Sequence, residues 1–400
     1  MRAAARIGFS RLLTRYAVAA NSLAAADQAI QLTPDDPDAH RARAAVLNRL
    51  HRAAEAEASL ETATSLRKDH AVQWLELGTT REELEDDAGA DAAGVNEAGA
   101  LVAYDQAVRC APYYGQTHWQ RGNLLLRLGR YADAFADLRQ GAASNRKFLP
   151  NLIDLAWSLT KGDVSQTQAL VQPANDDDRL EFARFLARKG KGEALVEQVG
   201  LLATPLSDQN RQELTRLAFA AGNYEAAYQL SSGSVKTEAI VNGGFEEPLL
   251  RSETPFGWRL SSAQATAKLA IDVSEKAEGH KSLQATFEGN WDASATSPIS
   301  QTIVVQSEGR YRLSFAVKTK DLITGGPPRI VLTDATNNQI LAKSDAFPQT
   351  TNMWQHMNVE FSVPAKAEAV IVSLTRDNCS SSPCPIFGVL WLDAFALTKL

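Results

Sequence analysis

The sequence predicts a chain with two kinds of domain: a right-handed α-solenoid followed by an antiparallel β-sandwich of the jelly-roll type. In the first half, small and apolar residues recur with a period of about 34 residues, as in stacked pairs of helices. Near residue 231 the composition changes from Ala, Leu, Arg and Glu to Val, Ile, Thr and Ser. Segments that alternate between polar and apolar residues follow, and such segments favour strands. A chain of 400 residues is also too long for one ordinary core, so we expect separate domains.

The bulk composition excludes several classes of protein. With 41 basic and 47 acidic residues, the formal net charge is −6, whereas a nucleic-acid-binding protein usually carries a basic face. We therefore expect no nucleic-acid partner. No apolar run approaches the roughly 20 residues that cross a bilayer, and the N-terminal stretch lacks the uninterrupted apolar segment of a cleavable signal peptide.

The segment 115–138 carries the clearest repeat. Gly122 and Ala134 are expected where two helices touch, because a larger side chain would push the helices apart. Gly129 is expected to end the first helix, where a left-handed residue is needed. Together with Tyr131, these residues and their spacing resemble one tetratricopeptide repeat (TPR), a pair of antiparallel helices.

The same frame extends in both directions along the chain. Earlier repeats begin at residues 3, 37 and 71, the match weakens after Pro150, and the spacing from Gly222 to Ala227 restores it. We expect about six or seven helix pairs, and we assign residues 1–231 to this repeat domain.

One repeat is predicted to contain an insertion, at about residues 82–99. The second helix of the repeat that begins at Ala71 arrives late in the frame. The intervening stretch is acidic, rich in Gly and without an apolar period, so we expect a mobile loop there.

The TPR resemblance implies a concave groove that binds a protein or peptide partner. The candidate partner-binding residues are polar positions on the first helix of each repeat: Gln73, Glu76, Gln116, Arg121, Asn151 and Asp154. For each of them the alternative is an ordinary solvated surface. Trp74 and Trp119 match core positions of the repeat instead.

The second half is predicted to follow a short flexible linker at 232–239. Its alternating segments are 268–273, 282–288, 299–305, 311–318, 329–332, 354–363, 369–376 and 389–397. Short strands separated by turn signals indicate an antiparallel sandwich over residues 240–400.

Residues 240–400 also resemble the galactose-binding-like jelly rolls of carbohydrate-binding modules. The resemblance rests on the segments 240–246, 257–258, 279–283, 309–315, 354–364 and 390–397. It implies the fold strongly and sugar binding less so, because many relatives bind no sugar.

In such modules the first and last strands lie side by side and share a structural calcium ion. The resemblance implies that the carboxylates of Glu246 and Asp393 are ligands, with a backbone carbonyl near Lys281 as the third. Calcium favours such hard oxygen ligands. The alternative is that Glu246 and Asp393 are ordinary carboxylates at a sheet edge.

A sugar site on this fold needs aromatic rings that face outward among polar groups. The strand at 354–361 alternates, with Trp354, His356 and Asn358 on its polar face, and Arg312 alternates in the same way on its own strand. Trp291 lies in a polar loop and is expected at the rim of the site. The alternative is that Trp354, Trp291 and Trp258 cover the core. Two or more of these rings exposed together would favour sugar binding, and all three buried would favour a protein-binding domain.

The sequence contains no metalloprotease, phosphate-loop or nucleophile-elbow motif, so we do not expect an enzyme. We expect a non-catalytic scaffold of the bacterial cell envelope that links a protein partner to a polysaccharide, in exopolysaccharide or O-antigen assembly. One alternative is a pure protein-interaction adaptor whose jelly roll binds no sugar. Another is an accessory chain of a carbohydrate-active enzyme.

The expected location rests on two observations that disagree. A disulfide between Cys379 and Cys384 would suit a periplasmic or extracellular site, whereas the missing signal peptide would suit the cytoplasm. We favour the envelope. The chain begins inside a repeat, without a capping helix, so a membrane-protein partner is a further hypothesis.

Overall fold

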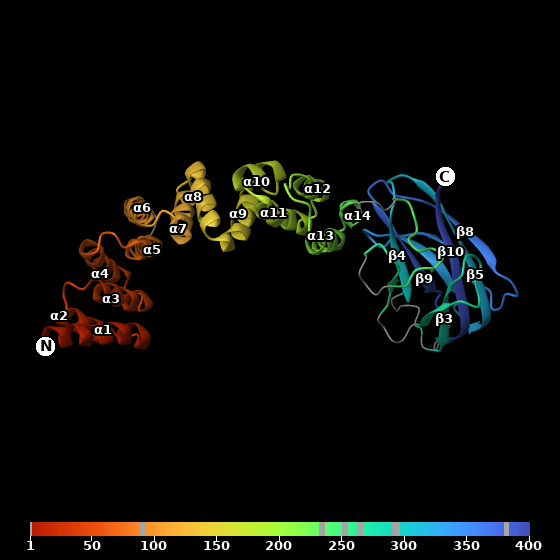
Figure 1. Ribbon diagram of the computed structural model, residues 1–400, viewed down its shortest axis with the longest axis horizontal. Helices are drawn as coiled ribbons and strands as arrows, with labels where there is room; N and C mark the ends of the chain where they lie inside the picture. The colour runs from red at the N-terminus through yellow and green to blue at the C-terminus, as the bar shows by residue number, and fades with distance from the viewer. Residues whose placement is uncertain are drawn as a thin grey trace. The chain divides into compact units, whose positions relative to one another are not determined.

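The computed structural model describes residues 2–88, 93–231, 237–249, 255–261, 267–289, 291, 297–379 and 384–400. It divides the chain into two compact units, Met1–Ala174 and Asn175–Leu400. The first unit is helical, and the second combines further helices with both β-sheets (Figure 1). In the described part of the chain, no helix is long and apolar enough to cross a membrane.

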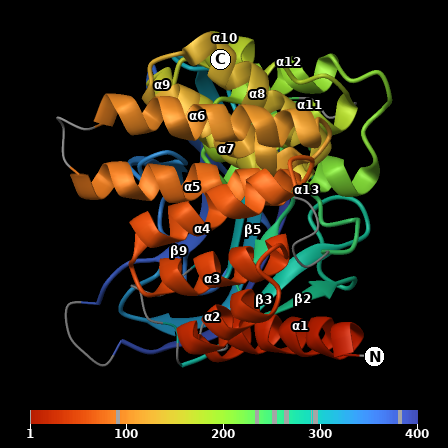
Figure 2. The same ribbon diagram turned by 90° about the vertical axis from the view of Figure 1, so that its left-hand side faces the viewer.

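Consecutive helices pack as antiparallel pairs, which confirms the predicted helical repeats (Figures 1 and 2). In the first unit the helices are α1 (Arg2–Ala20), α2 (Leu23–Leu32), α3 (Pro37–Arg49), α4 (Ala53–Leu66), α5 (Ala71–Ala88), α6 (Ala93–Cys110), α7 (Gly115–Arg127), α8 (Tyr131–Ser144), the 3₁₀ turn η1 (Arg146–Phe148), α9 (Leu149–Leu159) and α10 (Val164–Val171). In the second unit they are α11 (Asp176–Arg188), α12 (Gly192–Gly200), α13 (Asp208–Ala220) and α14 (Tyr224–Ser231).

Glycines set how closely these helices approach, as the sequence predicts. A Cβ atom added at Gly122 would lie 2.8 Å from Cγ of Leu138, and one at Gly78 would lie 2.5 Å from the ring of Tyr104. Gly129 has φ +73° and follows the last turn of α7, so it ends that helix in the left-handed conformation.

A ring nitrogen closes the turn before the first helix of several repeats, a feature that was not predicted. Nε2 of His40 donates to the carbonyl of Pro34 at 2.7 Å, and Nε2 of His118 donates to that of Pro112 at 2.8 Å. Nε1 of Trp74 donates to the carbonyl of Lys68 at 2.8 Å. Each bond spans six residues, so these equivalent positions fix the turn before the first helix of their repeats.

The prediction of a mobile loop at residues 82–99 was wrong. Helix α5 continues to Ala88 and α6 begins at Ala93, and residues 89–92 lie outside the described residues. Ala and Glu, which are strong helix formers, extend both helices. The guanidinium of Arg81 on α5 also donates to the carbonyl of Gly99 on α6, which ties the pair together, and to Glu57 and Glu61 on α4.

The strands form two five-stranded antiparallel sheets, which confirms the predicted sandwich (Figure 1). Sheet A has the order β1-β4-β9-β6-β7, and sheet B has the order β2-β3-β10-β5-β8. The strands are β1 (Arg259–Leu260), β2 (Lys268–Asp272), β3 (Ser282–Glu288), β4 (Ile299–Val304), β5 (Arg310–Thr324), β6 (Pro328–Asp334), β7 (Ile340–Lys343), β8 (Gln355–Ser362), β9 (Ala369–Arg376) and β10 (Ile386–Lys399).

The core lies between the two sheets, and at strands β5 and β8 the other face of sheet B is polar. On β5, Tyr311, Leu313 and Phe315 are buried in this core, because successive side chains of a strand point to opposite faces. Arg312 and Ser314 therefore lie on the outer face.

Within the second unit, helices α13 and α14 pack against the sandwich. The ring of Phe256 lies 5.4 Å from that of Phe219 and 5.2 Å from that of Tyr228. The hydroxyl of Tyr224 donates to the carbonyl of Ala335 at 2.9 Å. The last helix pair and the sandwich thus form one compact unit. Residues 232–236 of the predicted linker lie outside the described residues, so that linker stays a prediction.

Candidate functional site

The outer face of sheet B at strands β5 and β8 brings several predicted site residues together. We call it the β5–β8 face and define it by the outward side chains of Arg310, Arg312, Ser314, His356, Asn358, Glu360 and Ser362, with the buried Ala316 beneath them. In the register of the two strands, Arg312 is opposite Glu360, Ser314 opposite Asn358, and Ala316 opposite His356. Three predicted sugar-binding residues, Arg312, His356 and Asn358, therefore share one continuous surface.

Some polar side chains of this face already bond to other side chains of the protein, and others do not. Arg312 donates from Nε at 3.0 Å and from a terminal nitrogen at 2.6 Å to the same oxygen of Glu360. Arg310 lies 3.9 Å from the other oxygen of Glu360. Within the described residues, the exposed side chains of His356 and Asn358 have no hydrogen-bond partner. Their donors and acceptors are thus open to a ligand.

A cavity of about 480 Å³ adjoins this face, and its lining was not predicted. It is lined by Arg310, Gln339, Ile340, Leu341, Glu360, Phe361, Ser362 and Pro364. It lies where β8, at the edge of sheet B, meets β7, at the edge of sheet A. The short strand β7 had no clear alternation in the sequence. The volume falls in the range of small-molecule sites.

The predicted aromatic residues do not gather on this face. Trp354, which directly precedes β8, is half-buried. The Trp258 ring packs against Phe245 and Phe395, and its Nε1 donates to the carbonyl of Asn242 at 3.0 Å. The arrangement expected to favour sugar, with two or more exposed rings, is therefore not met. The arrangement with all three rings buried is not met either.

The prediction that Trp291 lies at an exposed rim was wrong. Its side chain is only 2% exposed, and its ring stacks on Phe287 at 5.3 Å inside the core of the sandwich. The buried guanidinium of Arg376 donates to the Trp291 carbonyl and fixes the backbone there. Arg376 comes from the distant strand β9, and Phe287 belongs to the core face of the preceding strand β3, so the polar residues next to Trp291 did not indicate either contact.

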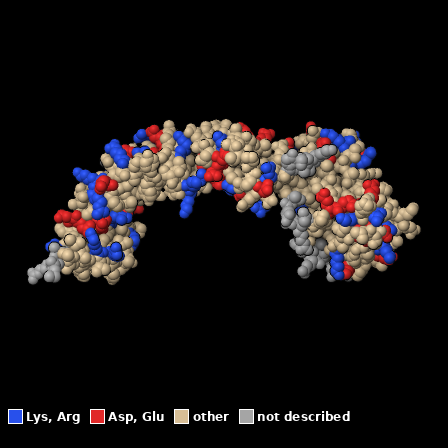
Figure 3. Space-filling model, viewed as in Figure 1, with Lys and Arg blue, Asp and Glu red and all other residues tan. Residues whose placement is uncertain are grey.

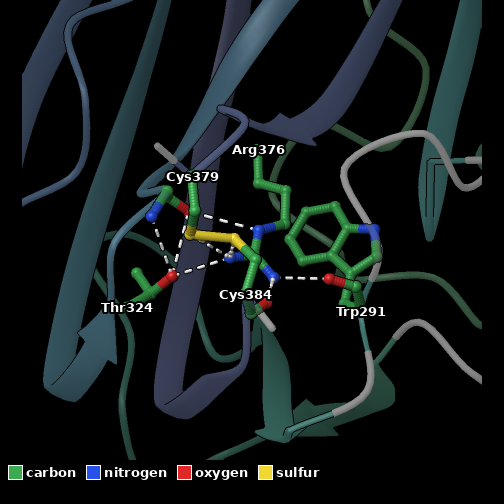
Figure 4. The surroundings of a disulfide bond; sticks show 6 residues. Trp291, Thr324, Arg376, Cys379 and Cys384 are labelled. Atoms are coloured by element: carbon green, nitrogen blue, oxygen red, sulfur yellow. Dashed lines mark hydrogen bonds between the residues drawn. A yellow bond between two sulfur atoms is a disulfide. The ribbon is translucent and has the colours of Figure 1, made fainter. Parts of the chain in front are cut away.

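Arg376 also links the backbone at Trp291 to the disulfide between Cys379 and Cys384 (Figure 4). It donates to the carbonyl of Cys384 at 2.9 Å and to Oγ1 of Thr324 at 2.7 Å. The two cysteines of the predicted pair are thus joined, and their loop is held to the core through one arginine.

The three residues of the predicted calcium site lie close together. Glu246 and Asp393 flank Gly244, since a Cβ atom added there would lie 3.8 Å from Oδ1 of Asp393 and 3.8 Å from Cγ of Glu246. The ammonium group of Lys281 donates to the backbone carbonyl of Glu246. Among the described residues, no group of three or more His, Cys, Asp or Glu side chains is arranged to hold a metal ion.

Three of the six predicted groove residues of the helical repeats, Gln73, Glu76 and Arg121, are buried or paired within the protein. Gln73 is fully buried, and no hydrogen bond within the described residues reaches its amide, so its prediction as a surface residue was wrong. Glu76 accepts two hydrogen bonds from Arg41, at 2.7 and 2.8 Å. Arg121 donates to Asp105 and Asp137, and the hydrogen bond with Asp137 raises the pKa of the arginine. These bonds hold neighbouring helices together.

Three other predicted groove residues remain at the surface. Asn151 and Asp154 on α9 are exposed, and Gln116 on α7 is half-buried. Figure 3 shows Lys and Arg side chains beside Asp and Glu along the helical elements, as the ion pairs require. Asn151 and Asp154 on α9 are therefore the most exposed of the predicted groove residues.

The sandwich, with the polar β5–β8 face, corresponds to a known type of domain. Residues 237–380 match a family described as a carbohydrate binding domain. The match covers most of this carbohydrate-binding-type sandwich. A comparison with curated proteins found no match.

Solved structures are similar to each half of the chain. For the helical half, a thermophilic TPR protein from Thermus thermophilus is 18% identical, covers 54% of this chain and 98% of its own, and has a TM-score of 0.32. YrrB, a TPR protein with an unusual peptide-binding site, is 16% identical, covers 56% of this chain and 89% of its own, and has a TM-score of 0.30.

For the carbohydrate-binding-type sandwich, a CBM4 structure is 16% identical, covers 40% of this chain and 99% of its own, and has a TM-score of 0.29. The module TmCBM61, determined in complex with β-1,4-galactotriose, is 16% identical, covers 42% of this chain and 100% of its own, and has a TM-score of 0.28.

Proposed function

We propose that this protein is a non-catalytic scaffold that binds a polysaccharide on the β5–β8 face and a protein or peptide partner on its helical repeats. The observation that supports this most is the position of Arg312, His356 and Asn358 on one face of a sandwich that matches a carbohydrate binding domain. Repeats of helix pairs typically bind proteins.

Each group on the face has a distinct role in this proposal. The Asn358 amide both donates and accepts, so it can pair with a sugar hydroxyl in either direction. Arg312 and Glu360 hold each other in a fixed orientation, which presents a charged donor and a charged acceptor to neighbouring hydroxyls. Trp354 lies next to this row and would cover one face of a sugar ring.

We place this function in the bacterial cell envelope, in exopolysaccharide or O-antigen assembly, with a membrane protein as one candidate partner. The disulfide between Cys379 and Cys384 supports an oxidising compartment. Asn151 and Asp154 would contribute to the protein-binding surface.

The test is binding of the full chain to a panel of purified bacterial polysaccharides, measured by affinity electrophoresis. Arg312→Ala and Asn358→Ala are each expected to weaken binding about tenfold, which is the loss of one well-placed hydrogen bond. Lys268→Ala is the matched control, because Lys268 is an exposed, ion-paired residue on β2, at the opposite edge of the same sheet. Equal weakening in all three variants would refute the proposed face.

A second candidate function is a protein-interaction adaptor whose sandwich binds no sugar. The burial of Trp258 and Trp291 favours it, because only Trp354 of the three expected rings is left near the surface. Absence of binding to every polysaccharide, with a protein partner still captured, would support this alternative.

A further inference from the structure

The segment 275–281 connects the beginning and the end of the sandwich. It runs from the end of β2 to the start of β3 and contacts Glu246 near the start of the domain and Asp393 on its last strand. The resemblance to carbohydrate-binding modules implies a calcium ion between these two carboxylates. The hydrogen-bond donors around them allow this expectation to be tested.

Backbone N–H groups point at both carboxylates. Oδ2 of Asp393 accepts from the N–H groups of Ala277 at 2.8 Å and Glu278 at 3.0 Å. Oε1 of Glu246 accepts from those of His280 at 2.6 Å and Lys281 at 3.1 Å. Calcium needs six to eight oxygen ligands, and an N–H group cannot be one. The groups present therefore fit two anions held by a loop, not a metal ion.

A cation of the chain itself is also present. The Lys281 ammonium donates to the carbonyl of Glu246, which is the kind of backbone oxygen that a calcium ion would use. Asp393 is fully buried, and a buried carboxylate requires compensation by hydrogen bonds or by a nearby positive charge.

Gly279 makes the close approach of the segment to Glu246 feasible. It has φ +60°, and a Cβ atom there would lie 2.2 Å from Oε1 of Glu246. Only glycine fits both the conformation and the space, so the segment is shaped around the carboxylate.

We infer that this sandwich has no structural calcium ion, and that the Lys281 ammonium and the N–H groups of Ala277, Glu278, His280 and Lys281 take its place in joining the two ends of the domain. The junction is thus independent of metal. It keeps its structure in a chelator, and it does not require the calcium concentrations found outside the cell.

The test is the melting temperature of the full chain in excess calcium and in a chelator, with calorimetric titration of calcium. The expected result is the same melting temperature in both and no saturable heat of binding. A higher melting temperature in calcium, or a binding isotherm that disappears in Glu246→Gln, would overturn the inference.

The role of Lys281 is tested by Lys281→Met. The expected fall in melting temperature is roughly 3 °C or more. Lys276→Met is the matched control, because Lys276 is exposed in the same segment and donates to the carbonyl of Val273 at 3.3 Å. An unchanged melting temperature in Lys281→Met would refute the role of this lysine. If that variant does not fold, the calcium titration of the native chain decides the inference by itself.

Discussion

The predicted groove of the helical repeats and the β5–β8 face of the sandwich use polar residues in opposite ways. On the helices, Glu76 and Arg121 are engaged in ion pairs that join neighbouring helices. On the sheet, His356 and Asn358 are exposed and have no hydrogen-bond partner within the described residues. Glu76 and Arg121 therefore hold helices together, whereas His356 and Asn358 are open to a ligand.

The largest effect is expected at Asp137, which tests whether the helical ion pairs stabilise the fold. Asp137 is buried and accepts hydrogen bonds from Arg121 and His118. Asp137→Ala would leave the arginine without its main partner, so we expect the free energy of unfolding to fall by about 3 kcal/mol. Urea denaturation of the full chain measures this.

Asp133 on the same helix is the matched control. It pairs with Arg130 at the surface, and both side chains are more than half exposed. Asp133→Ala is expected to change the free energy of unfolding by less than about 0.5 kcal/mol. Equal losses in the two variants would contradict the distinction between engaged and surface ion pairs.

A smaller effect of opposite sign is expected at Gln73. This buried amide has no hydrogen-bond partner within the described residues. Gln73→Leu removes the cost of burying it, so we expect stability to stay the same or rise by about 1 kcal/mol. Thermal denaturation measures this, and a marked loss would mean that the amide has a role in the repeats.

A substitution on the β5–β8 face is expected to weaken polysaccharide binding while leaving the stability of the fold nearly unchanged. His356→Ala is expected to change the free energy of unfolding by less than about 0.5 kcal/mol, because the side chain is exposed. Polysaccharide binding in the same variant is expected to weaken several-fold. A variant that loses stability and binding together would show that the face is structural.

The smallest effect is the dependence of stability on pH. Backbone hydrogen bonds from His280 and Lys281 lower the pKa of Glu246 from its ordinary value of 4.5. A carboxylate with a lowered pKa stabilises the fold above the pKa of the unfolded chain, and this contribution is lost as the pH falls through the pKa of the folded state. The melting temperature is thus expected to fall below pH 4.5, and to fall less steeply in Glu246→Gln. Equal slopes would contradict this contribution.

The sequence predicts the fold well because the repeat and the strands depend on local spacing. Gly122 and Gly129 lie where the repeat frame requires a close contact and a helix end, and alternation placed Arg312 and Asn358 on one face. These features depend on residues that are near one another in the sequence or on adjacent strands.

The features that were missed depend on distant residues or on competing local signals. Trp291 is buried because its ring stacks on Phe287 while the distant Arg376 holds its backbone carbonyl. At residues 82–99, the Gly residues suggested a loop, yet the helix propensity of Ala and Glu prevails. The N–H groups that surround Glu246 and Asp393 are backbone atoms, which no pattern of side chains indicates.

The most direct test of the proposed function is hydrogen–deuterium exchange of the full chain with and without a bound bacterial polysaccharide. We expect slower exchange at residues 310–316 and 355–362, the parts of β5 and β8 that form the face, and none of this protection in Asn358→Ala. Protection confined to other elements, or no protection with any polysaccharide in the panel, would contradict it.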